Sequence, residues 1–91
     1  MNKYVLLVID HLANPNKYTK KQLKANADAA NADYFAAYFA VVMPPITAAA
    51  RAAYRAADAS YVADDAASFW VDKYFRVTGE DKQTYIDALG A

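Results

Sequence analysis

The chain has 91 residues, with ten basic and ten acidic side chains and no cysteine. This length fits one domain, residues 1–91. The balanced charge gives no overall field that favours nucleic-acid binding, and the lack of cysteine excludes a disulfide framework and thiol chemistry. Eight tyrosines are a surplus, and tyrosine is common where a contact is half hydrated, as at protein interfaces.

The first predicted element is a short helix over residues 2–13. Its apolar side chains recur at helical spacing, and a single strand would have no partner elsewhere in the chain. The segment is too short to span a membrane and no signal-cleavage pattern follows it, so we expect a cytoplasmic protein with no membrane contact. His11, the only histidine, lies in the last turn without a second imidazole or a thiol nearby, which gives little support for a metal site or a general base.

A second helix, residues 20–43, is predicted to begin at a capping box formed by Thr19 and Gln22. Its main apolar stripe, which should pack against another helix, consists of Leu23, Ala27, Ala30, Tyr34, Ala37, Tyr38 and Val41. A second stripe, more than about 90° away around the helix, contains Phe35, Phe39 and Val42. A helix that is apolar on two sides needs two partners. We expect the first helix or another copy of the chain to cover the second stripe, and self-association is therefore predicted.

Four lysines, Lys17, Lys20, Lys21 and Lys24, cluster at the start of this helix. This is the unfavourable end of the helix macrodipole for cations. The cluster is interpreted either as a solvated basic face or as a patch for an acidic partner or phosphates. Because no base-reading side chains accompany the lysines, nucleic-acid contact would be salt-sensitive and non-specific, and sequence-specific DNA binding is not expected.

The longest predicted element is one helix over residues 45–77. It is dense in alanine, the strongest helix former, and has no glycine or proline between Thr47 and Phe75. Pro45 suits the first helical turn and Gly79 suits the left-handed position after the end. At about 1.5 Å per residue, the run from Ile46 would be on the order of 48 Å long. Its apolar face is mostly alanine in the first half, so the best-packed core is expected at the large side chains of the second half, which are Phe69, Trp70, Tyr74 and Phe75.

Asp64 falls on the apolar side of this long helix, with Tyr54 and Tyr61 on the neighbouring flank. A carboxylate in such a place must be paired, hydrogen-bonded or hydrated. Two interpretations stay open. Asp64 makes a polar contact across helices or faces water at an edge, or it belongs to a binding site in which the two tyrosines stack on a nucleotide base.

A short last helix, residues 80–89, should fold back onto Trp70 and Tyr74. The sequence therefore predicts an all-α fold, a small helical bundle with a long antiparallel helix pair (residues 20–43 and 45–77) and a short helix at each end. At Pro44-Pro45 the pair could form a hairpin or run on as a kinked rod. The hairpin is favoured, because it gives the main apolar stripe a helix to pack against.

Motifs for catalysis are missing from the sequence. It has no Gly-rich phosphate loop, no HExxH pattern, no EF-hand spacing and no Ser/His/Asp or Cys/His combination. The adjacent carboxylates Asp64 and Asp65 would point about 100° apart on a helix and could not share one substrate. We expect a non-catalytic protein that needs no cofactor and no metal.

The block AADASYVADDAASFWVDKYFRVTGEDKQTYIDAL resembles small Ala/Tyr-rich early or accessory proteins of tailed bacteriophages. The likeness covers roughly residues 25–89 and is most specific in WVDKYFRVTGEDKQTYIDAL. It implies an accessory protein in the cytoplasm of an infected bacterial host, where many such proteins act on host machinery or host defence. It assigns no functional residue.

Three functions follow as expectations. In the first, the protein binds and inhibits a host protein, and Phe35, Phe39 and the lysines are the candidate contacts. In the second, it is an oligomeric sponge that sequesters a nucleotide-like immune signal through Tyr54, Tyr61 and Asp64. The third is a structural or scaffold role without an inhibited target.

Overall fold

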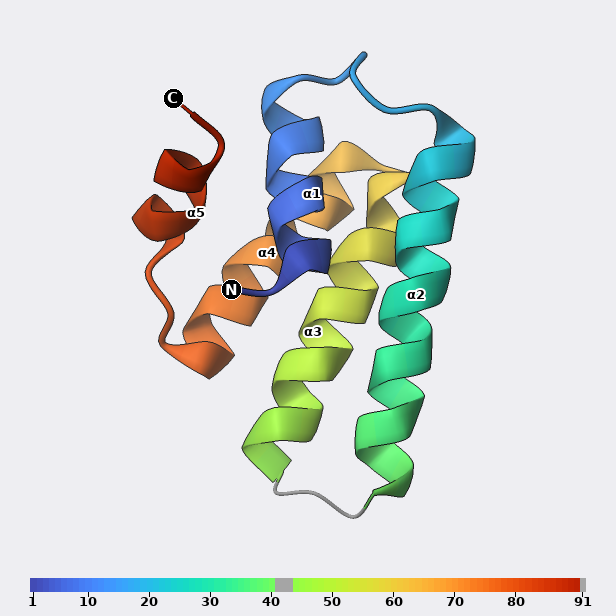
Figure 1. Cartoon of the computed structure of the whole chain (residues 1–91), viewed down its shortest axis with the longest axis vertical. Coiled ribbons are helices and arrows are strands. Elements are labelled where there is room, and N and C mark those ends of the chain that lie inside the picture. Colours follow the sequence, from blue (N-terminus) through green and yellow to red (C-terminus); the bar gives the residue numbers. More distant parts are fainter. Residues whose placement is uncertain (41–43, 91) are drawn as a thin grey trace.

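The computed structural model describes residues 1–40 and 44–90, and the side chains of 1–40 and 47–90 (Figure 1). The secondary structure of these residues is helical, with no strand: α1 Lys3–Ala13, α2 Lys20–Phe39, α3 Pro44–Ser60, α4 Asp64–Thr78 and α5 Lys82–Ala88. The prediction of a small all-α bundle is confirmed. α2 and α3 lie side by side and antiparallel, α1 packs on α3, and α4 packs on α3 from another side (Figure 1).

The α2–α3 pair is a hairpin over the described residues, as favoured from the sequence. The predicted capping box opens α2: Gln22 N donates to Thr19 Oγ1 (3.1 Å), and Thr19 N donates to Gln22 Oε1 (2.8 Å). α2 ends at Phe39, earlier than the predicted end at residue 43, because Ala40 already forms its C-cap. Val41 and Val42, which were assigned to the two apolar stripes, lie outside the described residues.

The predicted single helix over residues 45–77 is wrong, because a turn at residues 61–63 divides it into α3 and α4. Ser60 Oγ donates to the Ala57 carbonyl (2.6 Å), a local bond that competes with the helical ladder. The amides of Val62 and Ala63 both donate to the Ala59 carbonyl, at 2.9 and 2.8 Å, and so close the turn. The two aspartates that follow lie in the first turn of α4, where negative charge is favourable.

Burial of the alanine face explains why the helix divides. An unbroken helix on the order of 48 Å long would leave much of its second half without a helix to pack against. After the turn, α4 folds back along α3 and its Ala67 and Val71 become buried in the common core.

The core lies where α1 packs on the alanines of α3. Val5 and Val8 of α1 and Ala56 and Ala57 of α3 are fully buried. Alanine contributes little apolar area, so close approach of the helices must supply the packing contacts. The expected core at the large side chains of residues 69–75 is found only in part: Tyr74 is buried, Trp70 and Phe75 pack against the core, and Phe69 is 55% exposed.

The C-terminal segment folds back onto Tyr74 as expected, through Tyr85 of α5, and its second ring contact is with Phe75 and not with Trp70. The Tyr85 ring packs edge-on against Phe75 (ring centres 5.0 Å apart) and Tyr74 (6.5 Å), and its hydroxyl accepts a hydrogen bond from Asn2 N (2.7 Å). Gly79, with φ of 71°, takes the left-handed position that ends α4. α5 thereby ties the end of α4 to the start of α1.

Candidate functional site

A polar pocket of about 230 Å³ lies where the end of α1, the start of α2 and the α3–α4 turn meet. It brings together three of the residues selected from the sequence, Lys20, Tyr61 and Asp64, and adds His11 to them. We call it the turn pocket. Tyr54 is not among its lining residues, so the two candidate tyrosines lie in different surroundings.

His11 and Asp64 join α1 to α4 at this pocket. His11 Nε2 lies 3.0 Å from Asp64 Oδ1, and the histidine is only 6% exposed whereas the aspartate is exposed. His11 Nδ1 is buried and has no hydrogen-bond partner among the described residues. A proton on Nε2, donated to Asp64, avoids burying an unpartnered N–H. Asp64 therefore makes a polar contact across helices, in keeping with the first interpretation of this residue.

The chemistry available in the turn pocket is hydrogen bonding to a polar ligand. Ser60 also lines the pocket, but its hydroxyl donates to the Ala57 carbonyl. A serine nucleophile needs its hydroxyl within hydrogen-bond reach of a base. The described contacts of His11 are instead with Asp64, so imidazole, carboxylate and hydroxyl do not form a relay.

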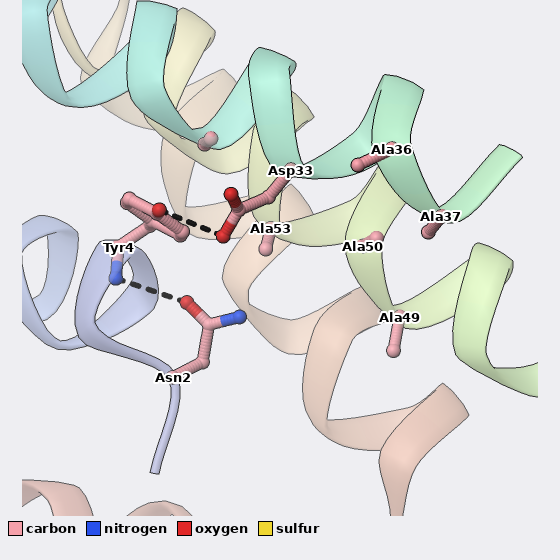
Figure 2. A pocket seen from close by; sticks show the side chains of 9 residues that line it. Asn2, Tyr4, Asp33, Ala36, Ala37, Ala49, Ala50 and Ala53 are labelled. Atoms are coloured by element: carbon pink, nitrogen blue, oxygen red, sulfur yellow. Dashed lines mark hydrogen bonds between the residues drawn. The ribbon is translucent and has the colours of Figure 1, made fainter. Parts of the chain in front are cut away.

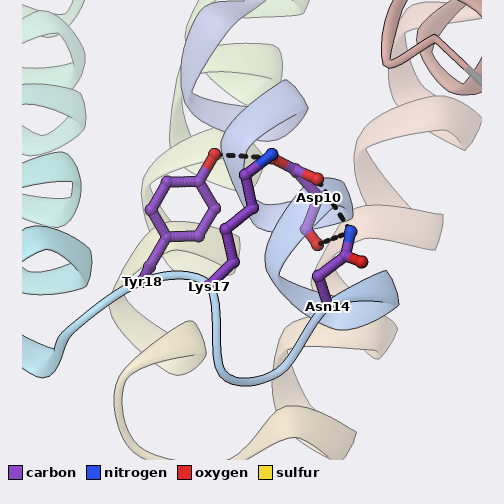
Figure 3. Close-up of polar contacts among 4 residues, drawn as sticks. All are labelled: Asp10, Asn14, Lys17 and Tyr18. Atoms are coloured by element: carbon purple, nitrogen blue, oxygen red, sulfur yellow. Dashed lines mark hydrogen bonds and ion pairs between the residues drawn. The ribbon is translucent and has the colours of Figure 1, made fainter.

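A second polar cluster fixes the loop beside the pocket (Figure 3). Asp10 is 4% exposed and accepts hydrogen bonds from Lys17 Nζ (2.6 Å), Tyr18 Oη (2.6 Å) and Asn14 Nδ2 (3.0 Å). The bonds from Lys17 and Tyr18 lower the pKa of the Asp10 carboxyl, and the bond to Asp10 raises the pKa of the Tyr18 phenol. The three donors thus hold a buried negative charge and position the Tyr18 ring at the turn pocket.

The four candidate lysines do not act as one basic patch. Lys17 pairs with Asp10, and Lys24 Nζ lies 3.3 Å from Asp28 Oδ2 one helical turn away. Lys20 lines the turn pocket and Lys21 is exposed on α2. Two of the four positive charges are therefore balanced within the chain, which favours the interpretation as a solvated face.

Tyr54 belongs to the α2–α3 contact. Its ring is stacked on Tyr34 of α2, with ring centres 6.1 Å apart and an interplanar angle of 5°, and the Arg55 guanidinium lies 5.9 Å from the Tyr54 ring centre. The Tyr54 ring is therefore already stacked on the Tyr34 ring and flanked by the Arg55 guanidinium.

Next to this stack, α2 carries a surface of exposed aromatic rings. Phe35 is 48%, Tyr38 60% and Phe39 71% exposed, and we call these three residues the α2 aromatic surface. Phe35 and Phe39 lie parallel with ring centres 6.0 Å apart, and Tyr38 meets Phe39 edge-on at 5.3 Å. The alternative in which the first helix covers this stripe is wrong, since both phenylalanines remain exposed with α1 in place.

A shallow groove of about 340 Å³ runs between α2 and α3 on the other flank (Figure 2). Ala36 and Ala37 face Ala49 and Ala50 across it, and Tyr4 Oη donates to Asp33 Oδ2 (2.7 Å) at one end. The hydrogen bond to the Asp33 carboxylate raises the pKa of the Tyr4 phenol. This bond ties α1 to α2.

Sequence reasoning missed Asp10 and the Tyr4–Asp33 pair. The available signal for Asp10 was an acidic residue inside an otherwise apolar helical segment, followed by several hydrogen-bond donors within eight positions. The Tyr4–Asp33 bond joins residues 29 positions apart, and no local pattern predicts it.

Within the described ranges, no group of three or more His, Cys, Asp or Glu side chains could hold a metal ion. None of the helices described is both long enough and apolar enough to cross a membrane. Comparison with protein-family models, curated proteins and solved structures gives no match.

Proposed function

We propose that this chain is a non-catalytic protein that binds another protein through the α2 aromatic surface. The observation that carries the proposal is the exposure of Phe35, Tyr38 and Phe39 on neighbouring turns of one helix. Large rings that stay in contact with water forgo the free energy of burial, about 25 cal/mol per Å² of apolar surface. A cluster of such rings marks an interaction surface more often than a single exposed one does.

The arrangement of the rings suits a protein partner. Aromatic side chains are enriched at interface centres, where they dominate the binding free energy. The stacked pair Phe35–Phe39 and the edge-on contact of Tyr38 restrict these side chains before binding. Less conformational entropy is then lost when the partner covers them.

The biological setting of the proposal comes from the sequence resemblance to phage accessory proteins. In that setting the partner is a host protein, defence-related machinery being the leading class, and binding inhibits it. Self-association through the same surface is the competing use, since another copy of the chain could cover these rings. Native mass spectrometry separates the two, because a homo-oligomer and a complex with a host protein differ in mass.

Affinity capture from a bacterial lysate tests the proposed surface with matched variants. The double variant Phe35→Asp/Phe39→Asp is compared with Phe69→Asp, which changes a phenylalanine of similar exposure on α4. We expect wild type and Phe69→Asp to retain the same specific partner and the double variant to lose it at least about tenfold, the loss expected for an interface anchor. A folded double variant that captures the partner as well as wild type would contradict the proposal. If the captured partner keeps full activity in the complex, the inhibitory part of the proposal is wrong.

A further inference from the structure

A groove between α3 and α4 combines an aromatic wall with two cations. It has a volume of about 260 Å³ and is lined by Ala48, Arg51 and Ala52 of α3 and by Trp70, Lys73 and Val77 of α4. We call it the Trp70 groove. It exists only because the chain turns at residues 61–63 and brings α4 back along α3.

The two cations in the groove have no counterion among the described residues. Arg51 and Lys73 are both exposed, and neither makes an ion pair or a side-chain hydrogen bond within residues 1–40 and 47–90. The carboxylate next to Lys73 in sequence, Asp72, pairs with Lys82 of α5 instead (3.6 Å). Like charges that line one groove repel each other, and an anion placed between them removes the repulsion. The electrostatics of the groove therefore favour an anionic ligand.

The indole supplies the second element of recognition. Trp70 is half-buried, and its ring is held edge-on by Phe69, with ring centres 5.4 Å apart at 87°. An indole fixed in this way offers a surface on which a planar aromatic ring can stack. The alanines and Val77 complete an apolar lining that would exclude water from such a ring.

The volume limits the size of the ligand. The groove volume of about 260 Å³ lies just below the range of about 300–1,000 Å³ that is typical of pockets for drug-sized ligands, so the groove suits a small molecule better than a macromolecule. A folded peptide segment or a dinucleotide would extend well beyond it. The combination of small size, two cations and one aromatic wall matches a compact anion that carries a planar ring.

We propose that the Trp70 groove binds a nucleoside monophosphate, with the base stacked on Trp70 and the phosphate held by Arg51 and Lys73. The guanidinium of Arg51 can donate two parallel hydrogen bonds to phosphate oxygens, and the Lys73 ammonium adds a point charge. This site is separate from the α2 aromatic surface, so nucleotide binding can be tested independently of the proposed protein partner.

The single tryptophan of the chain makes the groove directly observable. Its indole N–H gives one resonance in a ¹H–¹⁵N spectrum, and this resonance is followed during titrations with adenosine monophosphate, adenosine and inorganic phosphate. We expect saturable shifts with adenosine monophosphate, and binding at least tenfold weaker for adenosine and for phosphate, since each supplies half of the contacts. The absence of a saturable shift with adenosine monophosphate would overturn the proposal. If inorganic phosphate bound as tightly as adenosine monophosphate, the proposed stacking of the base on Trp70 would be wrong.

Matched charge variants distinguish a built site from general attraction of anions. Arg51→Gln/Lys73→Gln removes the two groove cations, whereas Arg55→Gln/Arg76→Gln removes one cation from each of the same helices outside the groove lining. All four side chains are exposed, so both variants should fold. We expect a loss of affinity of at least tenfold for the groove variant and less than threefold for the control. Equal losses in the two variants would show that only net charge matters and would overturn the assignment.

Discussion

The two ends of the α2–α3 hairpin are built differently. At the end where α2 begins, which we call the polar end, Asp10 binds Lys17 and Tyr18, and His11 binds Asp64. At the end where α2 finishes, the aromatic end, the described side chains contact one another through rings, and the α2 aromatic surface is exposed. Buried directional bonds fix one arrangement of the chain, whereas exposed rings leave apolar area available to a partner. The comparison indicates that stability is concentrated at the polar end, and the surface proposed to bind a partner lies at the aromatic end.

The largest effect on stability is expected from Asp10→Ala. This change removes a buried acceptor of three side-chain hydrogen bonds, one of them from a charged donor, and should lower the free energy of unfolding by about 3 kcal/mol. Asp28→Ala, which removes only an exposed pair with Lys24, should change it by less than about 0.5 kcal/mol. Urea unfolding followed by circular dichroism measures both. Equal losses of unfolding free energy in the two variants would show that the buried Asp10 network stabilises the fold no more than the exposed Lys24–Asp28 pair does.

Overpacking the alanine core is expected to have the next largest effect. Ala56 is fully buried between helices, so Ala56→Leu should destabilise the fold by about 1–3 kcal/mol. Ala25, which is exposed on α2, is the matched site, and Ala25→Leu should change stability by no more than about 0.5 kcal/mol. Thermal unfolding of the two variants compares the sites. If Ala56→Leu were as stable as wild type, close packing of the helices would not require a small side chain at position 56.

Alkaline pH should have a smaller effect on stability, and this effect is specific to buried tyrosine. Burial raises the pKa of the Tyr74 phenol well above its ordinary value of 10.0, and a hydrogen bond to Tyr85 adds to the shift. The folded protein then holds the proton more tightly than the unfolded chain, so stability is complete below pH 10 and falls as pH rises above it. The slope is at most about 1.4 kcal/mol per pH unit for each phenol. Tyr74→Phe should flatten this decline, and Tyr38→Phe, a change at an exposed ring of the aromatic end, should leave it unchanged in unfolding experiments between pH 8 and 11.

A small effect on stability is expected from Phe35→Asp/Phe39→Asp, although this variant should have the largest effect on binding. The rings are exposed, so their loss removes little buried area. The two new carboxylates, one turn apart near the end of a helix, should cost no more than about 1 kcal/mol. A loss of several kcal/mol in urea unfolding would show that these rings support the fold, and the loss of partner binding could then no longer be assigned to the surface.

Local patterns were sufficient to predict most of the helices. The Thr19 capping box and the left-handed Gly79 each mark a helix end through the conformation of a few neighbouring residues. The alanine face of α3 was likewise predicted, because helical periodicity places Ala53, Ala56 and Ala57 together.

The turn at residues 61–63 could not be predicted from propensity alone, because each of its residues tolerates a helix. The chain breaks there since folding back buries Ala67 and Val71, which is a property of the whole molecule. The acidic pair Asp64-Asp65 was the local signal of a new helix. Asp64 was instead interpreted as a polar contact across helices or as part of a binding site, both on one unbroken helix. The same tertiary step creates the Trp70 groove and brings Asp64 to His11, so neither could be derived from spacing along one helix.

Residue-resolved hydrogen exchange of the isolated protein tests the contrast between the two ends most directly. The first half of α2 contributes the buried residues Leu23, Ala27 and Ala30, and the second half carries the exposed rings. Amides open more easily where fewer buried contacts hold the helix. The account predicts that amides of residues 23–30 exchange at least about tenfold more slowly than those of 34–39, a difference of about 1.4 kcal/mol in opening free energy. Equal protection along α2 would contradict it, because the aromatic end would then be as firmly held as the polar end.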